Sequence, residues 1–223
     1  LRLGKTHFDG GALVKACING SSEFMSNISM SIVGILYNAQ LMRLGGENGI
    51  AAYGVMMYVS MIFASTFVGY CVGMAPVVSF HFGAENTSEL KGLLRKGLVI
   101  IGVFGITMTI AAELLSTPLS AFFVGYDKEL LQLTVFGFRI FSLSFLFMGF
   151  GIFTSSFFTA LNDGVTSAIV SFLRTLVFQC AAILLLPALW GIDGVWIAVV
   201  AAEVMSVVVS IVFLLAKKGK YHY

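Results

Sequence analysis

The sequence predicts an all-α polytopic membrane protein, organised as one bundle of six membrane-spanning helices. Of its 223 residues, 58% are hydrophobic and only 11% are charged, whereas soluble domains carry roughly 25% charged residues. The mean hydropathy is correspondingly high, at +0.97. The charged side chains fall mostly between the apolar runs rather than within them. A chain with this composition is expected to place its surface in the lipid bilayer.

The six predicted spans are apolar runs that reach the length of about 20 residues needed for a helix to cross a bilayer. Together they form a single six-helix lobe, residues 1–223, with spans at about 12–41, 50–81, 92–116, 130–160, 165–189 and 194–216. Several runs exceed the minimum length, so we expect tilted or kinked helices, or helix ends that project into water.

Turn-forming and charged residues separate the predicted spans. The separating segments are RLGGENG at 43–49, GAENTSELKGLLRK at 83–96, STPLSAFFVGYDKE at 116–129, LNDG at 161–164 and LWGIDG at 189–194. These segments therefore mark the expected boundaries between the spans.

Lysine and arginine predict the orientation, because short cytoplasmic loops carry an excess of both. One side of the membrane would hold Arg2, Lys5, Lys91, Arg95, Lys96, Lys217, Lys218 and Lys220, and the other only Arg43 and Lys128. Both termini of this segment are therefore expected in the cytoplasm. The chain opens on Leu1 rather than methionine, so we expect this residue to be an internal position of something longer.

Several classes of function find no support in the sequence. The net charge of +2 comes without a basic stripe that would suggest nucleic acid. Cysteines and histidines are dispersed, with no zinc or phosphate-loop motif, so neither metal nor cofactor is expected. An intramembrane hydrolase would need a pair of aspartates, or a serine with a base, at membrane depth, and the four aspartates all fall in loops. We therefore expect no enzymatic activity.

The first span carries a stripe of polar residues. Its members recur every three or four residues: Asn19, Glu23, Asn27, Ser31, Gly34 and Asn38. This spacing confines them to an arc of about 120° on a helix. Because a charge inside a bilayer costs a few kcal/mol, an intramembrane carboxylate is a candidate for ion or proton handling. We expect Glu23 to couple ions in a cavity lined by Asn19 and Asn27, or else to be a neutral packing residue.

Two further charged residues lie at membrane depth in the fifth and sixth spans. Arg174, in SFLRTLVFQ, is the only strong base of its span, and Glu203, in VVAAEVMS, is the natural type of partner. Both are candidates for the cavity or the coupling site, although the sequence leaves open whether they meet. Arg139 lies within the fourth span, and no partner can be assigned to it.

The second span combines small residues with a proline. Gly69 and Gly73 have the GxxxG spacing that lets another helix approach closely. Pro76, followed by Ser79, removes a backbone donor and is expected to bend the helix. Such a bend is either a packing kink or, as in transporters, a way to expose carbonyl groups to a substrate or an ion.

Two long stretches resemble the multidrug and toxic compound extrusion (MATE) family. RLGGENGIAAYGVMMYVSMIFASTFVGYCVGMAPVVSFHFGAENTSELK, residues 43–91, is similar to that family's eighth helix and the loop before it. FFTALNDGVTSAIVSFLRTLVFQCAAILLLPALWGIDGVWIA, residues 157–198, is similar to its eleventh helix, with a lone arginine, Leu-Pro and Gly-x-x-Gly-Val-Trp. The order of these motifs is that of the family's C-terminal half.

The resemblance implies one lobe of a twelve-helix antiporter in the bacterial cytoplasmic (inner) membrane. The N-terminal six-helix lobe would come from the same chain or a separate one. Such proteins export small amphipathic, often cationic compounds by alternating access and are driven by protons or sodium. Glu23 matches a seventh-helix glutamate of sodium-linked members, but no carboxylate near Gly149 matches their tenth-helix aspartate. H+ is therefore the expected coupling ion, with Na+ left open.

Two other functions remain open at this point. A flippase of lipid-linked saccharides or other lipids would be expected to line its cavity with several basic residues, and the spans hold few besides Arg139 and Arg174. The chain could also be a six-helix structural partner of another membrane chain.

Overall fold

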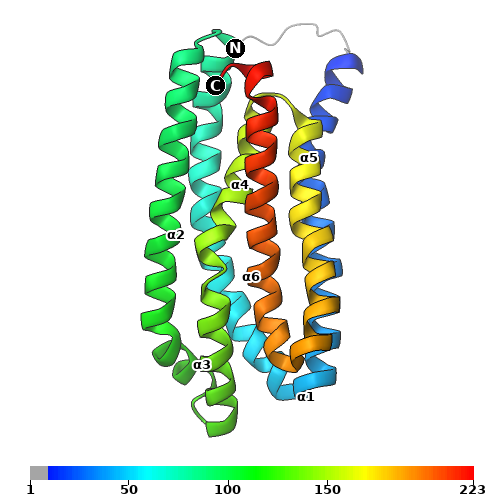
Figure 1. Ribbon diagram of the computed structural model, residues 1–223, viewed down its shortest axis with the longest axis vertical. Coiled ribbons are helices and arrows are strands. Elements are labelled where there is room, and N and C mark those ends of the chain that lie inside the picture. The colour runs from blue at the N-terminus through cyan, green and yellow to red at the C-terminus, as the bar shows by residue number, and fades with distance from the viewer. Residues whose placement is uncertain (1–9) are drawn as a thin grey trace, which may run out of the picture.

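The computed structural model describes residues 10–223, which form an elongated bundle of helices (Figure 1). The described residues contain no β-strand, and this confirms the predicted all-α class. Their helices are α1 (Gly10–Gly83), α2 (Thr87–Val124), α3 (Lys128–Ser142), α4 (Phe145–Ala160), α5 (Gly164–Phe172), the π-helix η1 (Leu173–Phe178) and α6 (Gln179–Tyr221).

Helix α1 consists of two arms that meet at Gly46, residues 10–45 and 47–83. Gly46 has φ 59° and ψ −149°, a conformation that glycine adopts far more readily than other residues. The two arms run in opposite directions along the bundle (Figure 1). This reversal lies within the segment 43–49, where the sequence places a turn.

A second glycine reverses the chain in the C-terminal part. Helices α5 and η1 continue into α6 as far as Gly191, which has φ 58° and ψ −136°. The remainder of α6 returns along the bundle and ends at Tyr221 (Figure 1). This reversal lies within the expected turn at 189–194.

Helix α2 is longer than the third predicted span. It begins at Thr87, where the side chain of Asn86 accepts a hydrogen bond from the Glu89 amide, and it continues through Pro118 to Val124. The turns expected over 83–96 and 116–129 are therefore confined to a few residues each. Helix α2 extends beyond its predicted apolar span at both ends, and its end turns contain polar residues. From the sequence alone, these polar residues suggested longer loops.

The fourth predicted span, 130–160, is interrupted rather than continuous. Helices α3 and α4 meet at a bend of 46°. Before the bend, Ser142 Oγ lies 2.7 Å from the Arg139 carbonyl oxygen and 2.5 Å from Glu113 Oε1. Such side-chain bonds compete with the helical ladder, and this offers a physical reason for the bend. Arg139 itself is exposed and forms no ion pair with any described residue.

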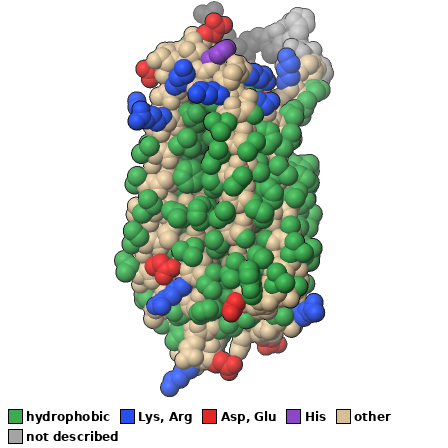
Figure 2. Space-filling model, viewed as in Figure 1, with side chains coloured by type: hydrophobic (Ala, Val, Ile, Leu, Met, Phe, Trp, Pro, Cys, Tyr) green, Lys and Arg blue, Asp and Glu red, His purple; other side chains and the backbone are tan. Residues whose placement is uncertain are grey.

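The surface of the bundle agrees with a membrane protein. Three helical runs are long and apolar enough to cross a membrane, namely Leu13–Gly83, Thr87–Val124 and Gly164–Tyr221, and the bent pair α3–α4 makes a fourth candidate. Figure 2 shows apolar side chains along the length of the visible face, with Lys and Arg gathered near the end where the C-terminus lies. The division into six membrane spans stays a prediction.

Candidate functional site

The polar stripe of the first arm of α1 lies mainly on the outside of the bundle. Glu23, Asn27, Ser31 and Asn38 are exposed, whereas Asn19 and Gly34 are half-buried. Nδ2 of Asn27 donates to the backbone oxygen of Glu23 at 2.8 Å, so the two side chains lie one helical turn apart on one face. The stripe therefore offers polar groups to whatever covers this face.

The Glu23 side chain is exposed on the outside of the bundle. It forms no ion pair with any described residue. Phe24 and Ile28 beside it on the helix are exposed, as they would be if they faced lipid or another apolar surface. Cys71 on the second arm is close enough to interact electrostatically with Glu23. A carboxylate in this setting needs water or another protein surface to solvate it.

Asn19 connects the stripe to the interior of the bundle. Its Nδ2 donates to the backbone oxygen of Thr159 on α4 at 3.3 Å, while its Oδ1 is buried with no hydrogen-bond partner among the described residues. The backbone of Asn19 packs directly against Gly164 at the start of α5, where a Cβ atom would clash. Asn19 is thus fixed by helix packing, in contrast to Glu23 and Asn27.

Gly69 and Gly73 make no close helix contact among the described residues, and the approach of another helix expected from their spacing stays a prediction. A Cβ atom at either glycine would meet nothing within 4 Å, so the GxxxG spacing mediates no close helix contact here. Both glycines are exposed, because the apolar residues that alternate with them face the core instead: Phe67, Cys71, Met74 and Val78.

Pro76 and Ser79, which follow on the same arm of α1, have different surroundings in the structure. Pro76 lies exposed inside α1, whose only non-helical backbone dihedrals are at Gly46, and the bend expected at Pro76 stays a prediction. Ser79 Oγ donates to the backbone oxygen of Ala160 at 2.9 Å. Ser79 therefore satisfies a carbonyl group at the end of α4.

Arg174 and Glu203 form a buried ion pair, which answers a question that the sequence left open. Arg174 Nε lies 3.1 Å from Glu203 Oε2, and Nη2 lies 3.0 Å from Oε1. The side chains are 15% and 3% exposed. Two parallel bonds between a guanidinium and a carboxylate are the strong form of this contact. Gly151 on α4 makes room for the pair, because a Cβ atom there would clash with Arg174 Cδ.

A tyrosine from α1 lies close to this pair. Tyr37 donates its hydroxyl hydrogen to Gln179 Oε1 at 2.9 Å, stacks on Tyr53 with 5.2 Å between the ring centroids and interacts electrostatically with Glu203. Gln179 directly follows η1. The pair and the tyrosine thus connect η1, α6 and the first arm of α1. Nothing in the spacing of Tyr37 along the sequence indicates this contact.

Hydroxyl groups join α4 to α5 in a continuous hydrogen-bonded series. Thr159 Oγ1 lies 2.7 Å from Ser167 Oγ, which lies 2.9 Å from Ser155 Oγ, which in turn lies 2.6 Å from Ser171 Oγ. The Ser and Thr positions recur every four residues in both helices, a pattern that could have indicated a polar helix interface.

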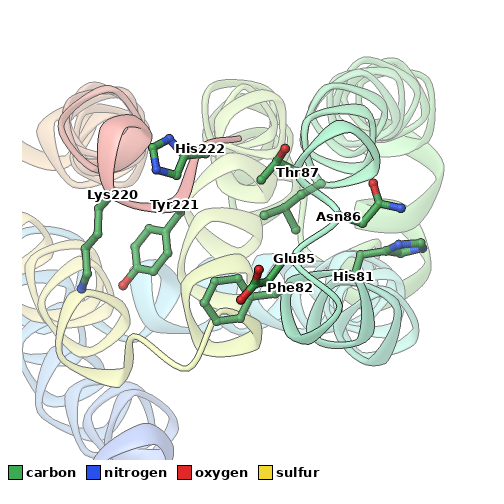
Figure 3. Close-up of a pocket in the computed structure, with 9 residues that line it drawn as sticks. His81, Phe82, Glu85, Asn86, Thr87, Lys220, Tyr221 and His222 are labelled. Carbon is green, nitrogen blue, oxygen red and sulfur yellow. The ribbon is translucent and has the colours of Figure 1, made fainter.

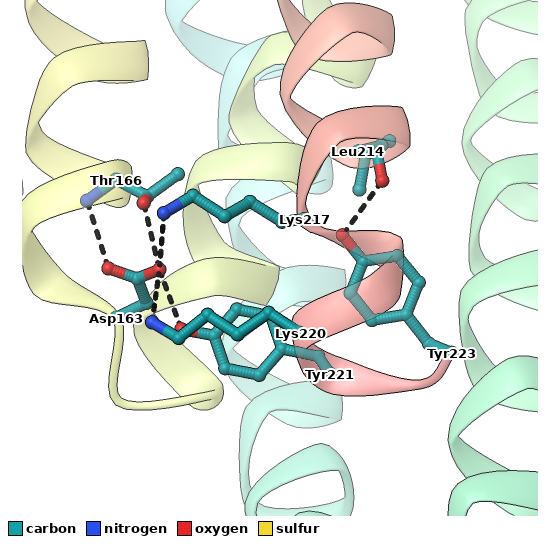
Figure 4. A network of polar contacts seen from close by, with 7 residues as sticks. All are labelled: Asp163, Thr166, Leu214, Lys217, Lys220, Tyr221 and Tyr223. Carbon is teal, nitrogen blue, oxygen red and sulfur yellow. Dashed lines mark hydrogen bonds and ion pairs between the residues drawn. The ribbon is translucent and has the colours of Figure 1, made fainter.

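Asp163 is the centre of a charged cluster that sequence reasoning missed (Figure 4). It accepts hydrogen bonds from Tyr221 Oη at 2.6 Å and Thr166 Oγ1 at 2.8 Å. Lys217 and Lys220 approach it to 3.6 and 3.7 Å. Burial alone would raise the pKa of Asp163, but these hydrogen bonds and the charge of Lys217 outweigh burial and lower it to about 2.

The local sequence offered one signal for this cluster. Asp163 precedes the first turn of α5 and accepts a hydrogen bond from the Thr166 amide, as an N-cap residue does. Its contact with Tyr221 spans 58 residues of sequence, and no local pattern indicates such a contact.

A cavity of about 260 Å³ opens at the same end of the bundle. It lies between the α1–α2 turn and the end of α6, and Figure 3 shows His81 and Lys220 on opposite sides of it. Among the described residues, no group of three or more His, Cys, Asp or Glu is arranged to hold a metal ion.

Comparison with known proteins identifies the fold. The family model MatE matches residues 24–183. The multidrug export protein MepA from Staphylococcus aureus strains MSSA476 and N315 is 24% identical over 198 residues, which are 88% of this chain and 43% of MepA. The chain thus spans less than half the length of these curated relatives.

Solved structures share the fold at low sequence identity. A multidrug resistance MATE family transporter in an outward-facing conformation superposes with a TM-score of 0.87 at 20% identity, over 96% of this chain and 48% of the other. A MOP superfamily transporter from Pyrococcus furiosus gives 0.88 at 20% identity, over 97% and 49%.

The helical bundle with its apolar surface therefore has the fold of one lobe of a polytopic membrane transporter. The chain belongs to the MatE family. The family resemblance noted from the sequence is confirmed, and the coverage of about half of each solved chain agrees with a single lobe.

Proposed function

We propose that this chain is one lobe of a cation-coupled multidrug antiporter that exports small amphipathic, often cationic compounds by alternating access. The observation that carries the proposal is Glu23. It is an exposed carboxylate without an ionic partner among the described residues, on a polar stripe of a membrane helix. A second six-helix lobe, from the same chain or another, would cover this face and turn it into a cavity. The names of relatives such as MepA support multidrug export.

We propose H+ as the coupling ion, with no cofactor. One carboxylate is enough to bind one proton, whereas Na+ needs several oxygen ligands held together. The segment near Gly149 offers no second carboxylate. A proton on Glu23 removes the negative charge that attracts a cationic substrate, so proton and substrate would oppose each other's binding. By linkage, this opposition lets a proton gradient drive the substrate outward.

We place the lobe in the bacterial cytoplasmic membrane with both ends of the segment in the cytoplasm. Lys and Arg gather near the C-terminal end of the bundle (Figure 2), which is the end that the excess of basic residues assigns to the cytoplasm.

The test uses the complete native protein reconstituted into liposomes. An imposed pH gradient should drive efflux of a fluorescent cation such as ethidium, and Glu23→Gln should abolish that efflux. Glu47→Gln is the control, because Glu47 is also exposed on α1 but lies beside the reversal at Gly46. Unchanged efflux in Glu23→Gln would remove Glu23 from the mechanism.

The intact mass of the native gene product would show how the second lobe is supplied. A mass near twice the 24.0 kDa of this chain means that both lobes belong to one polypeptide. A mass near 24.0 kDa means that the lobe pairs with a separate six-helix chain.

A further inference from the structure

A second cavity lies at the end of the bundle where Lys and Arg side chains gather (Figure 2). It has a volume of about 420 Å³ and is formed by the first turns of α2 and the end of α6. The described residues that line it are Lys91, Leu215, Lys218, Gly219, His222 and Tyr223. None of these side chains is acidic and two are lysines, so the lining favours an anion.

The two lysines of this cavity have no acidic partner. Lys217 and Lys220, which flank Lys218 in the sequence, both approach Asp163, at 3.6 and 3.7 Å (Figure 4). Lys218 is exposed and forms no ion pair with any described residue, and the same holds for Lys91. Asp163 thus engages two of the three lysines at the end of α6, and the third lies at the cavity with its charge free.

The helix ends beside the cavity have opposing partial charges. Helix α2 begins at Thr87, where free amide groups carry partial positive charge, and α6 ends at Tyr221, where free carbonyl groups carry partial negative charge. Because these two contributions oppose each other, the side chains determine the charge of the site. His222 adds ring nitrogens that can form hydrogen bonds with a ligand.

Exposed apolar side chains continue from the cavity along both helices. Leu215 lines the cavity itself and precedes Lys218 by one helical turn. Helices α2 and α6 both pack against α4, which lies between them in Figure 1. The apolar side chains that are more than half exposed on these two helices include Val99, Ile106, Ile211 and Leu215.

Free positive charge next to exposed apolar surface matches an amphipathic anion. Lysine binds phosphate groups as a point charge, and basic pockets between helices at the ends of membrane spans suit the headgroups of anionic lipids. Such a lipid can place its phosphate between Lys91 and Lys218 and its acyl chains against Leu215. A free phosphate ion would use the same charges but would make no use of the apolar surface.

We propose that this cavity binds the phosphate group of an anionic phospholipid through Lys91, Lys218 and His222. The acyl chains lie along the exposed apolar side chains of α2 and α6. A bound lipid therefore bridges two helices that the bundle itself connects through α4. The site lies outside the proposed transport mechanism, because it requires neither proton coupling nor a particular exported compound.

The test locates a bound lipid by photochemical labelling of the complete native protein in detergent. The probe is a phosphatidylglycerol with a photoreactive group near its phosphate, and peptide mass spectrometry identifies the labelled segments. Labelling is expected within residues 87–95 and 215–223. Unlabelled phosphatidylglycerol should suppress it, whereas phosphatidylcholine with the same acyl chains should suppress it about tenfold less effectively. Labelling confined to other segments would overturn the proposal, and so would equal competition by the two lipids.

Single substitutions test the lysines. Lys91→Gln and Lys218→Gln should each weaken competition by unlabelled phosphatidylglycerol about tenfold, because each removes a contact to the phosphate group. Lys96→Gln is the matched control, since Lys96 is exposed on α2 and forms no ion pair with a described residue but does not line the cavity. Competition in Lys96→Gln should equal that in the wild type. An equal loss in all three variants would indicate general attraction to surface charge and would overturn the site.

Inorganic phosphate distinguishes a lipid from a free anion. Added in large excess over the lipid, it should leave the labelling unchanged. If inorganic phosphate suppressed the labelling as phosphatidylglycerol does, the cavity would be a site for a free anion and the lipid assignment would be overturned. Efflux does not enter this test. Failure of the labelling experiment therefore leaves the proposed antiporter function intact, and failure of the Glu23→Gln efflux test leaves the lipid site intact.

Discussion

Glu23 and Glu203 are both glutamates at membrane depth, yet the bundle treats them in opposite ways. Glu203 is almost fully buried and joined to Arg174 by two parallel bonds. Glu23 is exposed and has no ionic partner among the described residues. The inner carboxylate is completed within the lobe, whereas the outer one is left to a partner surface or to water. The difference shows that the side chains packed around a carboxylate, and not its position along an apolar helix, determine whether it is paired within the lobe.

The largest expected effect is on the inner pair. Glu203→Ala leaves the Arg174 guanidinium largely buried without a counter-charge, which should destabilise the folded state by about 3–5 kcal/mol. Thermal unfolding in detergent, followed by circular dichroism or tryptophan fluorescence, measures the loss. A melting temperature equal to that of the wild type would mean that the pair contributes little, and the contrast with Glu23 would disappear.

The next effect concerns the space that α4 provides for the pair. In Gly151→Val, the new side chain would overlap Arg174 Cδ and Ser206 Oγ, so we expect a loss of stability of about 1–3 kcal/mol. Gly73→Val is the matched control, because nothing lies within 4 Å of a Cβ atom at Gly73. Equal melting temperatures of the two variants would show that Gly151 does not confine the pair.

A third carboxylate, Asp163, extends the comparison to the pH dependence of stability. Its pKa is lowered from 3.8 to about 2, so its contribution to stability is present above pH 3.8 and is lost as the pH falls toward 2. The shift corresponds to about 2 kcal/mol. The stability difference between wild type and Asp163→Asn, measured by denaturant unfolding, should shrink over this range.

Asp193→Asn serves as the control for that experiment, since Asp193 is exposed and forms no ion pair with a described residue. A difference between wild type and Asp163→Asn that stays constant from pH 6 to pH 2 would contradict the role of the Tyr221 and Lys217 contacts.

The smallest stability effect is expected at the outer carboxylate. Glu23→Gln removes no ion pair with a described residue, so the melting temperature of the isolated lobe or the whole protein should change by an amount equivalent to less than about 0.5 kcal/mol. A large loss of stability would mean that Glu23 is a structural group, and the distinction from Glu203 would not hold.

Much of the architecture follows from local chemistry. The apolar composition predicts the all-α membrane class, and the two reversals occur at Gly46 and Gly191 inside segments where glycine clusters indicate turns. The bend between α3 and α4 was not predictable, because it involves Glu113 from another helix bonding to Ser142. Local patterns describe one helix at a time and carry no information on such contacts.

The candidate site was less predictable for the same reason. The four-residue spacing of Asn19, Glu23 and Asn27 correctly describes one face of a helix, but it cannot say which way that face points. The pairing of Arg174 with Glu203 bridges 29 residues and depends on how η1 packs against α6. The GxxxG spacing of Gly69 and Gly73 does not indicate whether a neighbouring helix is present on that side.

The reversal at Gly46 has a practical consequence for probing this protein. The two arms join through a single residue. The adjacent Gly45 packs against Ile192 at the other reversal, because a Cβ atom added to Gly45 would lie 2.6 Å from Ile192 Cδ1. The two hairpin tips therefore touch, but side chains on both of them stay exposed, among them Arg43, Glu47, Trp190 and Asp193. Proteolytic cleavage needs several residues of locally unfolded backbone, and here the backbone is helical on both sides of a single glycine. These tips should therefore resist proteases, while reagents that label exposed side chains can still report on which side of the membrane they lie.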